Sequence, residues 1–231
     1  MFESIIECNC NECLKRNPVF NVLTDEQLTS LSKNRFTAKY KEGETIFKQG
    51  TIITHILSLT SGLVKVYIEG LNEKSLILRI GQAGDLLGGP GLFTDKRFHY
   101  SVAALTECTG CFIDIEVLIS MVKENKDFAI NMLTHVNKTA INNFNKFIGL
   151  TQKQMQGRIA DALLYLSQNV YKSNKFSADI SRQDLADITA MTKESAIRIL
   201  KEFKDDQIIR VDNNDFEILK PEKLEFISMT G

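Results

Sequence analysis

Cysteine is the residue type in this sequence whose spacing points most directly to chemistry. Cys8, Cys10 and Cys13 form a C-x-C-x-x-C cluster near the start of the chain, and Cys108 and Cys111 form a C-x-x-C pair farther along. Thiolates bind soft metals and iron–sulfur clusters, and they also undergo redox exchange. In a chain without secretory features, such clusters favour a metal or redox site over structural disulfides. The plainer alternative is that Cys108 and Cys111 are small buried residues and that the N-terminal three do no chemistry.

A second group of side chains, near the C-terminus, is suited to reading DNA. From Ala196 to Phe203 apolar residues recur at intervals of three and four, which predicts an amphipathic helix with Thr192 as its N-cap. The opposite face carries polar and charged residues: Lys193, Glu194, Ser195, Arg198 and Lys201. Arginine binds guanine through two hydrogen bonds in the major groove, and glutamate accepts one from cytosine. The alternative is that Glu194 and Arg198, four residues apart, form only a surface ion pair worth about 0.3–0.5 kcal/mol.

A shorter helix is expected directly before this one. Ser181 is an N-cap residue, and the pattern of apolar residues that follows it breaks at residues 189–191. We expect the small residues Ala186 and Ala190 to lie where the two helices cross. The arrangement is that of a helix-turn-helix, whose second helix enters the major groove. Two packed helices in an ordinary core are the alternative.

The next part of the chain predicts a β-hairpin, so the helix-turn-helix is winged. Apolar runs at residues 208–211 and 216–219 flank a polar turn. In the first half, from about residue 36 to residue 115, glycines punctuate short apolar or alternating runs. Short strands with glycine turns predict a β-roll, barrel or sandwich. Thr24 caps a short helix that precedes this region.

Residues 117–156 return to helical spacing, and we expect one long helix there. An apolar stripe runs along it at intervals of three and four: Leu133, Val136, Ala140, Phe144 and Phe147. Such a stripe suits a partner helix, although it could instead pack on the β region. A helix-turn-helix protein that reads two half-sites needs two copies, which favours a homodimer.

Composition sets the class of protein. The 231 residues are 43% hydrophobic and 25% charged with a net charge of −1, so any DNA binding must rely on geometry and dimerisation. Apolar runs stay below the roughly 18 to 20 residues of a membrane span, and MFESIIECNC lacks the basic region of a signal peptide. We therefore expect a cytoplasmic protein with no membrane partner. The sequence has no H-E-x-x-H, G-x-S-x-G or P-loop motif, so we predict that it is not an enzyme.

Several segments resemble the Crp/Fnr family of bacterial transcription regulators. SRQDLADITAMTKESAIRILKEF is similar to the family's helix-turn-helix, and GRIA to the start of its DNA-binding domain. KEGETIFKQG, SGLVKVYIEG and GDLLGGPGLF resemble its cyclic-nucleotide-type β-roll. The resemblance runs from about Leu23 to Lys220 and implies an α+β fold with a jelly-roll-like β-roll. The expected parts are a cysteine-containing N-terminal arm (1–18), a β-roll sensor domain (19–116), a dimerisation helix region (117–156) and a winged helix-turn-helix domain (157–231).

The resemblance also implies roles for the second helix. Base contacts fall on Lys193, Glu194, Ile197 and Arg198, whereas phosphate contacts suit Ser181, Thr192, Ser195 and Lys201. Family members often have glycine or serine where Ile197 stands, and a branched apolar residue there suits a thymine methyl group. The implied partners are double-stranded DNA with a near-palindromic operator, a second copy of the chain, and RNA polymerase.

Three inputs to the sensor domain are open. Cyclic AMP is not expected, because Gly89 takes the place of the family's ribose-binding glutamate and His99-Tyr100 stands near its phosphate-binding arginine-serine pair. An iron–sulfur cluster, as in the Fnr branch, is the second input. ALTECTGCFIDIE resembles the segment around that branch's last ligand. The implied ligands are Cys8, Cys10, Cys13 and Cys111, with Cys108 as a substitute for one of them. Haem or another small molecule is the third input.

Overall fold

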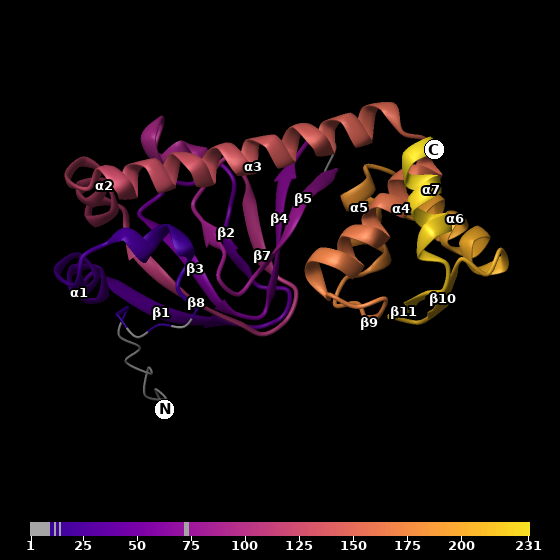
Figure 1. The fold of residues 1–231 in the computed structure, drawn as a ribbon, viewed down its shortest axis with the longest axis horizontal. Helices are drawn as coiled ribbons and strands as arrows, with labels where there is room; N and C mark the ends of the chain where they lie inside the picture. Colours follow the sequence, from indigo (N-terminus) through magenta and orange to yellow (C-terminus); the bar gives the residue numbers. More distant parts are fainter. Residues whose placement is uncertain (1–9, 12, 14, 72–73) are drawn as a thin grey trace. The chain divides into compact units, whose positions relative to one another are not determined.

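The computed structural model describes residues 10–11, 13, 15–71 and 74–231 (Figure 1). The chain forms two compact units. One comprises the chain up to Val66 together with Gly81–Ile141, and the other comprises Tyr67–Ile80 with Asn142–Gly231. Within the described ranges, no helix has the length and apolar character needed to cross a membrane.

The first half of the chain is built from two four-stranded sheets, which confirms the expected β-roll. The strand order is β1-β8-β3-β6 in one sheet and β2-β7-β4-β5 in the other. The strands are β1 (Arg35–Tyr40), β2 (Thr45–Phe47), β3 (His55–Ser61), β4 (Leu63–Glu69), β5 (Ser75–Gln82), β6 (Leu86–Leu87), β7 (Ser101–Ala104) and β8 (Cys108–Asp114).

Both faces of the first sheet are covered by apolar side chains. Because residues alternate between faces along a strand, Leu57 and Phe112 point into the roll, where they pack with Val64. Ile56 and Ile113 point outward into a second buried cluster, which the N-terminal segment and the helices of this unit complete. This second cluster holds the N-terminal segment against the sheet.

The helices of this region begin at local capping signals. Helix α1 (Asp25–Lys33) has the expected cap, since Thr24 and Gln27 form a reciprocal capping box. The single helix predicted over residues 117–156 is wrong: α2 (Ile115–Glu124) and α3 (Lys126–Gln152) are separate. Asn125 lies between them in an extended conformation, and its side chain accepts a hydrogen bond from the Phe128 N–H at 3.0 Å. Asparagine favours such capping positions over helix interiors, which explains the break.

The apolar stripe of α3 faces solvent in the single chain. The exposed fractions are 64% for Leu133, 46% for Val136, 61% for Phe144 and 47% for Phe147, and Ala140 is half-buried. Leu133 and Val136, which belong to the same unit as most of the β-roll, therefore do not pack on it.

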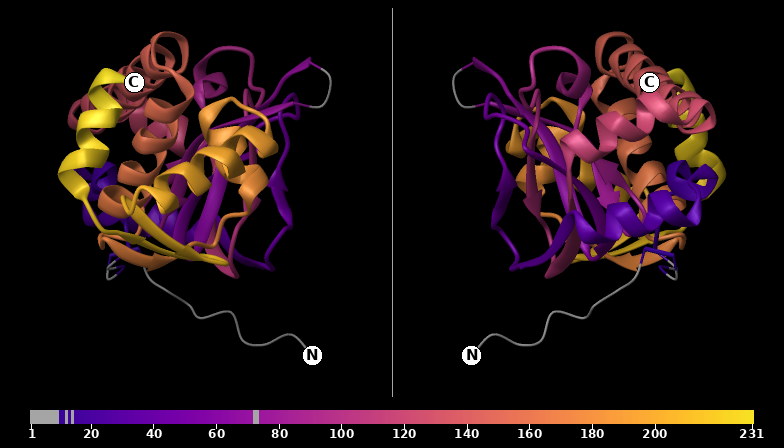
Figure 2. Two further views of the ribbon diagram at one scale, coloured as in Figure 1. Left: turned by 90° about the vertical axis from the view of Figure 1, so that its right-hand side faces the viewer. Right: turned by 90° about the vertical axis from the view of Figure 1, so that its left-hand side faces the viewer.

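The second half of the chain forms the predicted winged helix-turn-helix. Its three strands form a sheet of order β10-β11-β9. Figure 1 shows this sheet at one end of the helices of the unit, and Figure 2 gives two further views of it. The hairpin strands and the two motif helices were predicted, whereas β9 and α7 were not. The elements are α4 (Met155–Tyr165) with a π-helical turn (Leu166–Val170), β9 (Lys175–Ser177), α5 (Arg182–Thr189), α6 (Lys193–Asp205), β10 (Ile209–Asp212), β11 (Asp215–Ile218) and α7 (Pro221–Thr230).

The turn between α5 and α6 departs from one expectation. Ala186 is fully buried, as a residue at the helix crossing should be. Ala190, however, is exposed and adopts the left-handed conformation that ends α5, with φ 51°. The prediction that Ala190 lies at the crossing is therefore wrong, and its role is to form the turn.

This conformation generates a prediction about stability. Left-handed backbone costs a residue with a β-carbon about 1–2 kcal/mol, and glycine avoids that cost but adds about 0.4–1 kcal/mol of unfolded-chain entropy. We expect Ala190→Gly to raise the free energy of unfolding by about 0.5–1 kcal/mol, measured from the urea midpoint. Asn213, with φ 48°, is the matched control. Because asparagine tolerates this region, Asn213→Gly should change the midpoint little, and equal effects at both positions would contradict the argument.

Candidate nucleic-acid interface

The N-termini of α5 and α6 are fixed by their capping hydroxyls. The Ser181 hydroxyl accepts a hydrogen bond from the Asp184 N–H at 3.0 Å, and the Asp184 carboxylate accepts one from the Ser181 N–H at 2.9 Å. The Thr192 hydroxyl accepts from the Ser195 N–H at 3.2 Å and lies 3.1 Å from the Ser195 hydroxyl. The three hydroxyls predicted to contact phosphate therefore sit at helix N-termini, where positive partial charge favours anions.

One face of α6 is free for a ligand, and the other forms the core of the domain. Ala196, Ile199, Leu200 and Phe203 are buried, as their spacing predicts. The outward residues include Ile197, which is 45% exposed although it is apolar. The remaining side chains predicted to contact DNA are exposed on the same helix: Lys193, Glu194, Arg198 and Lys201. Their contacts with DNA stay a prediction.

Arg198 forms an ion pair, but not with Glu194, the partner that the alternative interpretation gave it. Its Nη1 atom lies 2.5 Å from Oε1 of Glu202, one turn toward the C-terminus, rather than from Glu194. Both side chains are about half exposed, and exposed pairs of this kind contribute about 0.3–0.5 kcal/mol. Exchanging this pair for a hydrogen-bonded guanine would therefore cost little, and Glu194 keeps its carboxylate available for a base.

The wing is attached to both motif helices. The Lys204 ammonium group at the end of α6 donates a hydrogen bond to the Val211 carbonyl of β10 at 3.1 Å. At the start of α5, Arg182 donates to the Asn213 carbonyl in the wing turn. Sequence reasoning did not single out Arg182, because its partner lies in a distant hairpin.

The cysteines form a second candidate site, on the outer face of the β-roll. Cys111 on β8 is buried, its sulfur lies 3.5 Å from Nη1 of Arg35, and burial is the main cause that raises the pKa of its thiol. Cys10 and Cys13 lie close enough to raise that pKa further. Cys10, Cys13 and Cys111 therefore lie on the same side of β8, within electrostatic reach of one another.

Other observations bear on the predicted metal site. Cys8 lies outside the described residues. Among those that are described, no group of three or more histidine, cysteine, aspartate or glutamate residues is arranged to hold a metal ion. Cys108 is buried at 1% exposure inside the roll with Val64 and Phe112, so it lies on the other face of β8 from Cys111.

The loop that precedes β7 is crowded at the position where a ribose-binding glutamate would stand. Gly89 has φ 83°, and a β-carbon added there would lie 3.0 Å from the Tyr100 ring. The Tyr100 hydroxyl accepts a hydrogen bond from the Gly88 N–H at 3.0 Å. A glutamate at position 89 would be strained by its backbone and would displace this ring.

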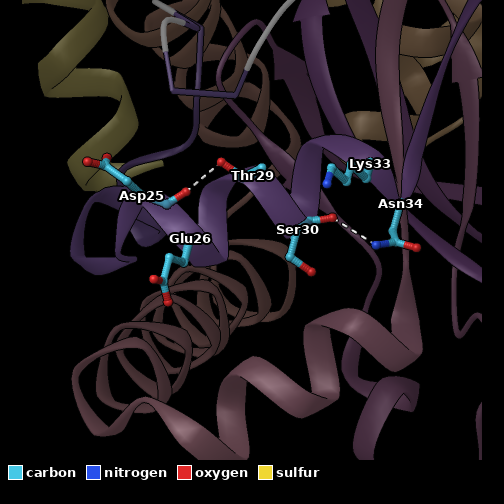
Figure 3. Close-up of a pocket in the computed structure, with 6 residues that line it drawn as sticks. All are labelled: Asp25, Glu26, Thr29, Ser30, Lys33 and Asn34. Atoms are coloured by element: carbon cyan, nitrogen blue, oxygen red, sulfur yellow. Dashed lines mark hydrogen bonds between the residues drawn. The ribbon is translucent and has the colours of Figure 1, made fainter.

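A hollow of about 450 Å³ on α1 is lined by Asp25, Glu26, Thr29, Ser30, Lys33 and Asn34 (Figure 3). These residues come from α1 and its C-cap residue Asn34, and Figure 3 shows that their charged groups point in different directions. Two of them, Thr29 and Asn34, donate hydrogen bonds to backbone carbonyls of the same helix. The arrangement provides no convergent set of groups for a small ligand.

Two family models match the chain. Residues 37–125 match the cyclic nucleotide-binding domain, and residues 157–227 match the Crp-like helix-turn-helix domain. The first covers most of the β-roll with α2, and the second begins within α4 and ends within α7. Together they match more than half of the chain.

Curated relatives and solved structures agree with these matches. The chain is 21% identical over 218 residues to the CRP-like cAMP-activated global transcriptional regulator of Mycobacterium tuberculosis, covering 93% of this chain and 97% of that protein. It is 25% identical over 190 residues to the cAMP-activated global transcriptional regulator CRP of Salmonella typhimurium, covering 80% of this chain and 90% of that protein.

Two solved structures share the fold. FixK2 from Bradyrhizobium japonicum has a TM-score of 0.77 at 15% identity, covering 85% of this chain and 98% of its own. A putative Crp/Fnr-family regulator from Eubacterium rectale has a TM-score of 0.77 at 19% identity, covering 92% of this chain and 98% of its own. With both domain models matched in order along one chain, the protein belongs to the Crp/Fnr family of transcription regulators.

Proposed function

We propose that this regulator binds a near-palindromic operator as a homodimer and recruits or blocks RNA polymerase there. We further propose that its β-roll senses a signal through the thiols near Cys111. The observation that carries the proposal is the outward face of α6, where basic, acidic and apolar side chains are exposed on a helix whose other face is fully buried. Such a face is suited to reading bases, because its charged groups can hydrogen-bond base edges and its apolar group can contact a thymine methyl.

Arg198 and Lys201 are expected to play different parts on that face. Arg198→Ala should weaken operator binding by about 1–3 kcal/mol and relax the choice of base at one position, because a guanine contact is lost. Lys201→Ala should weaken operator and random duplexes alike and reduce the slope of log K against log salt by about 0.9, because one phosphate contact is lost. Fluorescence anisotropy across a salt series measures both. Equal losses for Arg198→Ala on operator and random DNA would exclude it from base reading.

The homodimer is proposed from the exposed apolar stripe of α3. Phe144 is 61% exposed in the single chain, and a stripe of such residues on a long helix buries well against a second copy. We expect the Phe144→Asp protein to be monomeric, as measured by light scattering. A carboxylate at the dimer interface would be desolvated without gaining an ion-pair partner. Phe226 on α7 is the matched control, since it is equally exposed at 61% but lies off the stripe. Phe226→Asp should remain dimeric, and a dimeric Phe144→Asp protein would place the interface elsewhere.

The sensed signal is proposed from the thiols on the outer face of β8. Cys10 and Cys13 lie within electrostatic reach of the Cys111 thiol, and Arg35 places a positive charge 3.5 Å from its sulfur. The described thiols do not form a metal site as they stand, so binding would have to draw them together. Thiolates with a nearby cation suit an anionic iron–sulfur cluster, and Cys8 would supply the fourth ligand. When bound, such a cluster supplies a group that oxygen or nitric oxide can destroy. The residues themselves would tether the N-terminal segment to the outer face of β8.

The cysteines differ in what their removal should do. Protein prepared without air should be brown with about four iron atoms per chain, and Cys111→Ala should lose that iron. Cys108→Ala is the internal control. Because Cys108 points into the roll, away from Cys111, the Cys108→Ala protein should keep its iron. Colourless, iron-free protein under these conditions would contradict the cluster and leave haem or another small molecule as the effector. Calorimetry with cyclic AMP on the same samples should show no saturable signal, since the Tyr100 ring occupies the space beside Gly89.

A further inference from the structure

A stack of three aromatic rings ends at Arg182. Tyr171 stacks on Phe176 with ring centroids 4.7 Å apart, and Phe176 stacks on Phe216 at 5.6 Å, in both cases with nearly parallel planes. The Arg182 guanidinium lies over the Phe216 ring, 4.9 Å from its centroid. The stack therefore runs from the end of the π-helical turn, through β9 and β11 of the wing, to the first residue of α5.

Both central residues of the wing turn accept hydrogen bonds, one from α5 and one from the segment that precedes it. Arg182 donates a hydrogen bond through Nη2 to the Asn213 carbonyl, and the Ala178 N–H donates to the Asn214 carbonyl at 2.7 Å. Ala178 belongs to the short segment that leads into α5. Phe216, directly beyond the turn, is 2% exposed. The wing turn is thus held in one position against the N-terminal end of the first motif helix.

The Arg182 guanidinium group already has two partners within the domain, the Phe216 ring and the Asn213 carbonyl. The guanidinium is half-buried, with one ring face against Phe216 and a donor on Asn213, and burial lowers its pKa from the usual value. The turn that it holds carries two exposed carboxylates, Asp212 and Asp215, which face each other across the hairpin. An arginine committed to an aromatic face and a carbonyl is poorly placed to bind phosphate as well.

We propose that Arg182 is a positioning residue, which fixes the wing turn beside α5 and makes no contact with DNA phosphate. The proposal rests on the proposed function, because it concerns how the domain docks on an operator. If the turn were released, its two carboxylates would be free to approach the phosphate backbone, and ordering them on binding would cost conformational entropy. A fixed wing keeps these charges in a defined place while α6 reads the groove.

The test compares Arg182→Ala and Arg182→Lys with Arg210→Ala. Arg210 is the matched control, since it is an exposed wing arginine that pairs with Glu217 and does not touch α5. The Arg182→Lys protein keeps the charge but lacks the planar group that stacks on Phe216. Hydrogen exchange of the Ala178 amide reports whether the wing turn is docked, because its acceptor is in that turn.

We expect the Ala178 amide to exchange at least about tenfold faster in both Arg182 variants and at the wild-type rate in Arg210→Ala. Operator affinity should fall roughly five- to tenfold in both Arg182 variants, whereas the slope of log K against log salt should stay at the wild-type value. A residue that only packs the domain would leave the operator affinity of the folded protein unchanged.

Two results would overturn the proposal. A slope reduced by about 0.9 in Arg182→Ala would assign Arg182 to a phosphate, and unchanged exchange at Ala178 would show that Arg182 does not hold the wing. Failure of the wild-type protein to bind any duplex would count against the proposed function, and the exchange measurement would still report on Arg182.

Discussion

The close crossing of α5 and α6 constrains every side chain that could face DNA. Ala186 on α5 and Ala196 on α6 have no exposed surface, and small residues let two packed helices approach closely. The Thr189 hydroxyl, buried at the end of α5, donates to backbone carbonyls of its own helix, so the crossing leaves it satisfied. With one face of α6 locked in this way, the opposite face must project outward. The wing then takes its place by contacts to the two helices already fixed.

Features set by near neighbours in the sequence could be predicted. The caps at Ser181 and Thr192 depend on residues three positions away, and the buried face of α6 follows from its periodicity. The break at Asn125 was missed because helical spacing continues on both sides of it. Strand β9 was missed because three residues carry little periodicity and its partner, β11, lies far along the chain. Helix α7 does carry a local signal, a proline at its first position, which is typical of helix starts.

In the candidate sites, too, local features could be predicted from the sequence and contacts between distant residues could not. The exposure of Arg198 followed from its position on the helix, but its ion-pair partner did not, because Glu194 and Glu202 are equally spaced from it. Arg182 reads as an ordinary polar residue in the first turn of a helix, and only the folded hairpin gives it a ring and a carbonyl. The electrostatic influence of Cys10 on the Cys111 thiol likewise depends on the N-terminal segment lying on the outer face of the sheet. Contacts between residues far apart in the sequence depend on the fold, so the pattern of one segment cannot predict them.

The position of the C-x-x-C pair on β8 has a consequence for how such motifs are interpreted. In a turn or at the start of a helix, two cysteines three positions apart have their sulfur atoms side by side and can chelate one ion. In a strand, an odd separation sends them to opposite faces, so Cys108 and Cys111 inhabit different chemical environments separated by the thickness of the sheet. A sequence search for C-x-x-C alone would therefore classify this pair wrongly as two ligands of one metal ion. The backbone conformation between two ligands belongs in the definition of a metal motif as much as the ligands themselves.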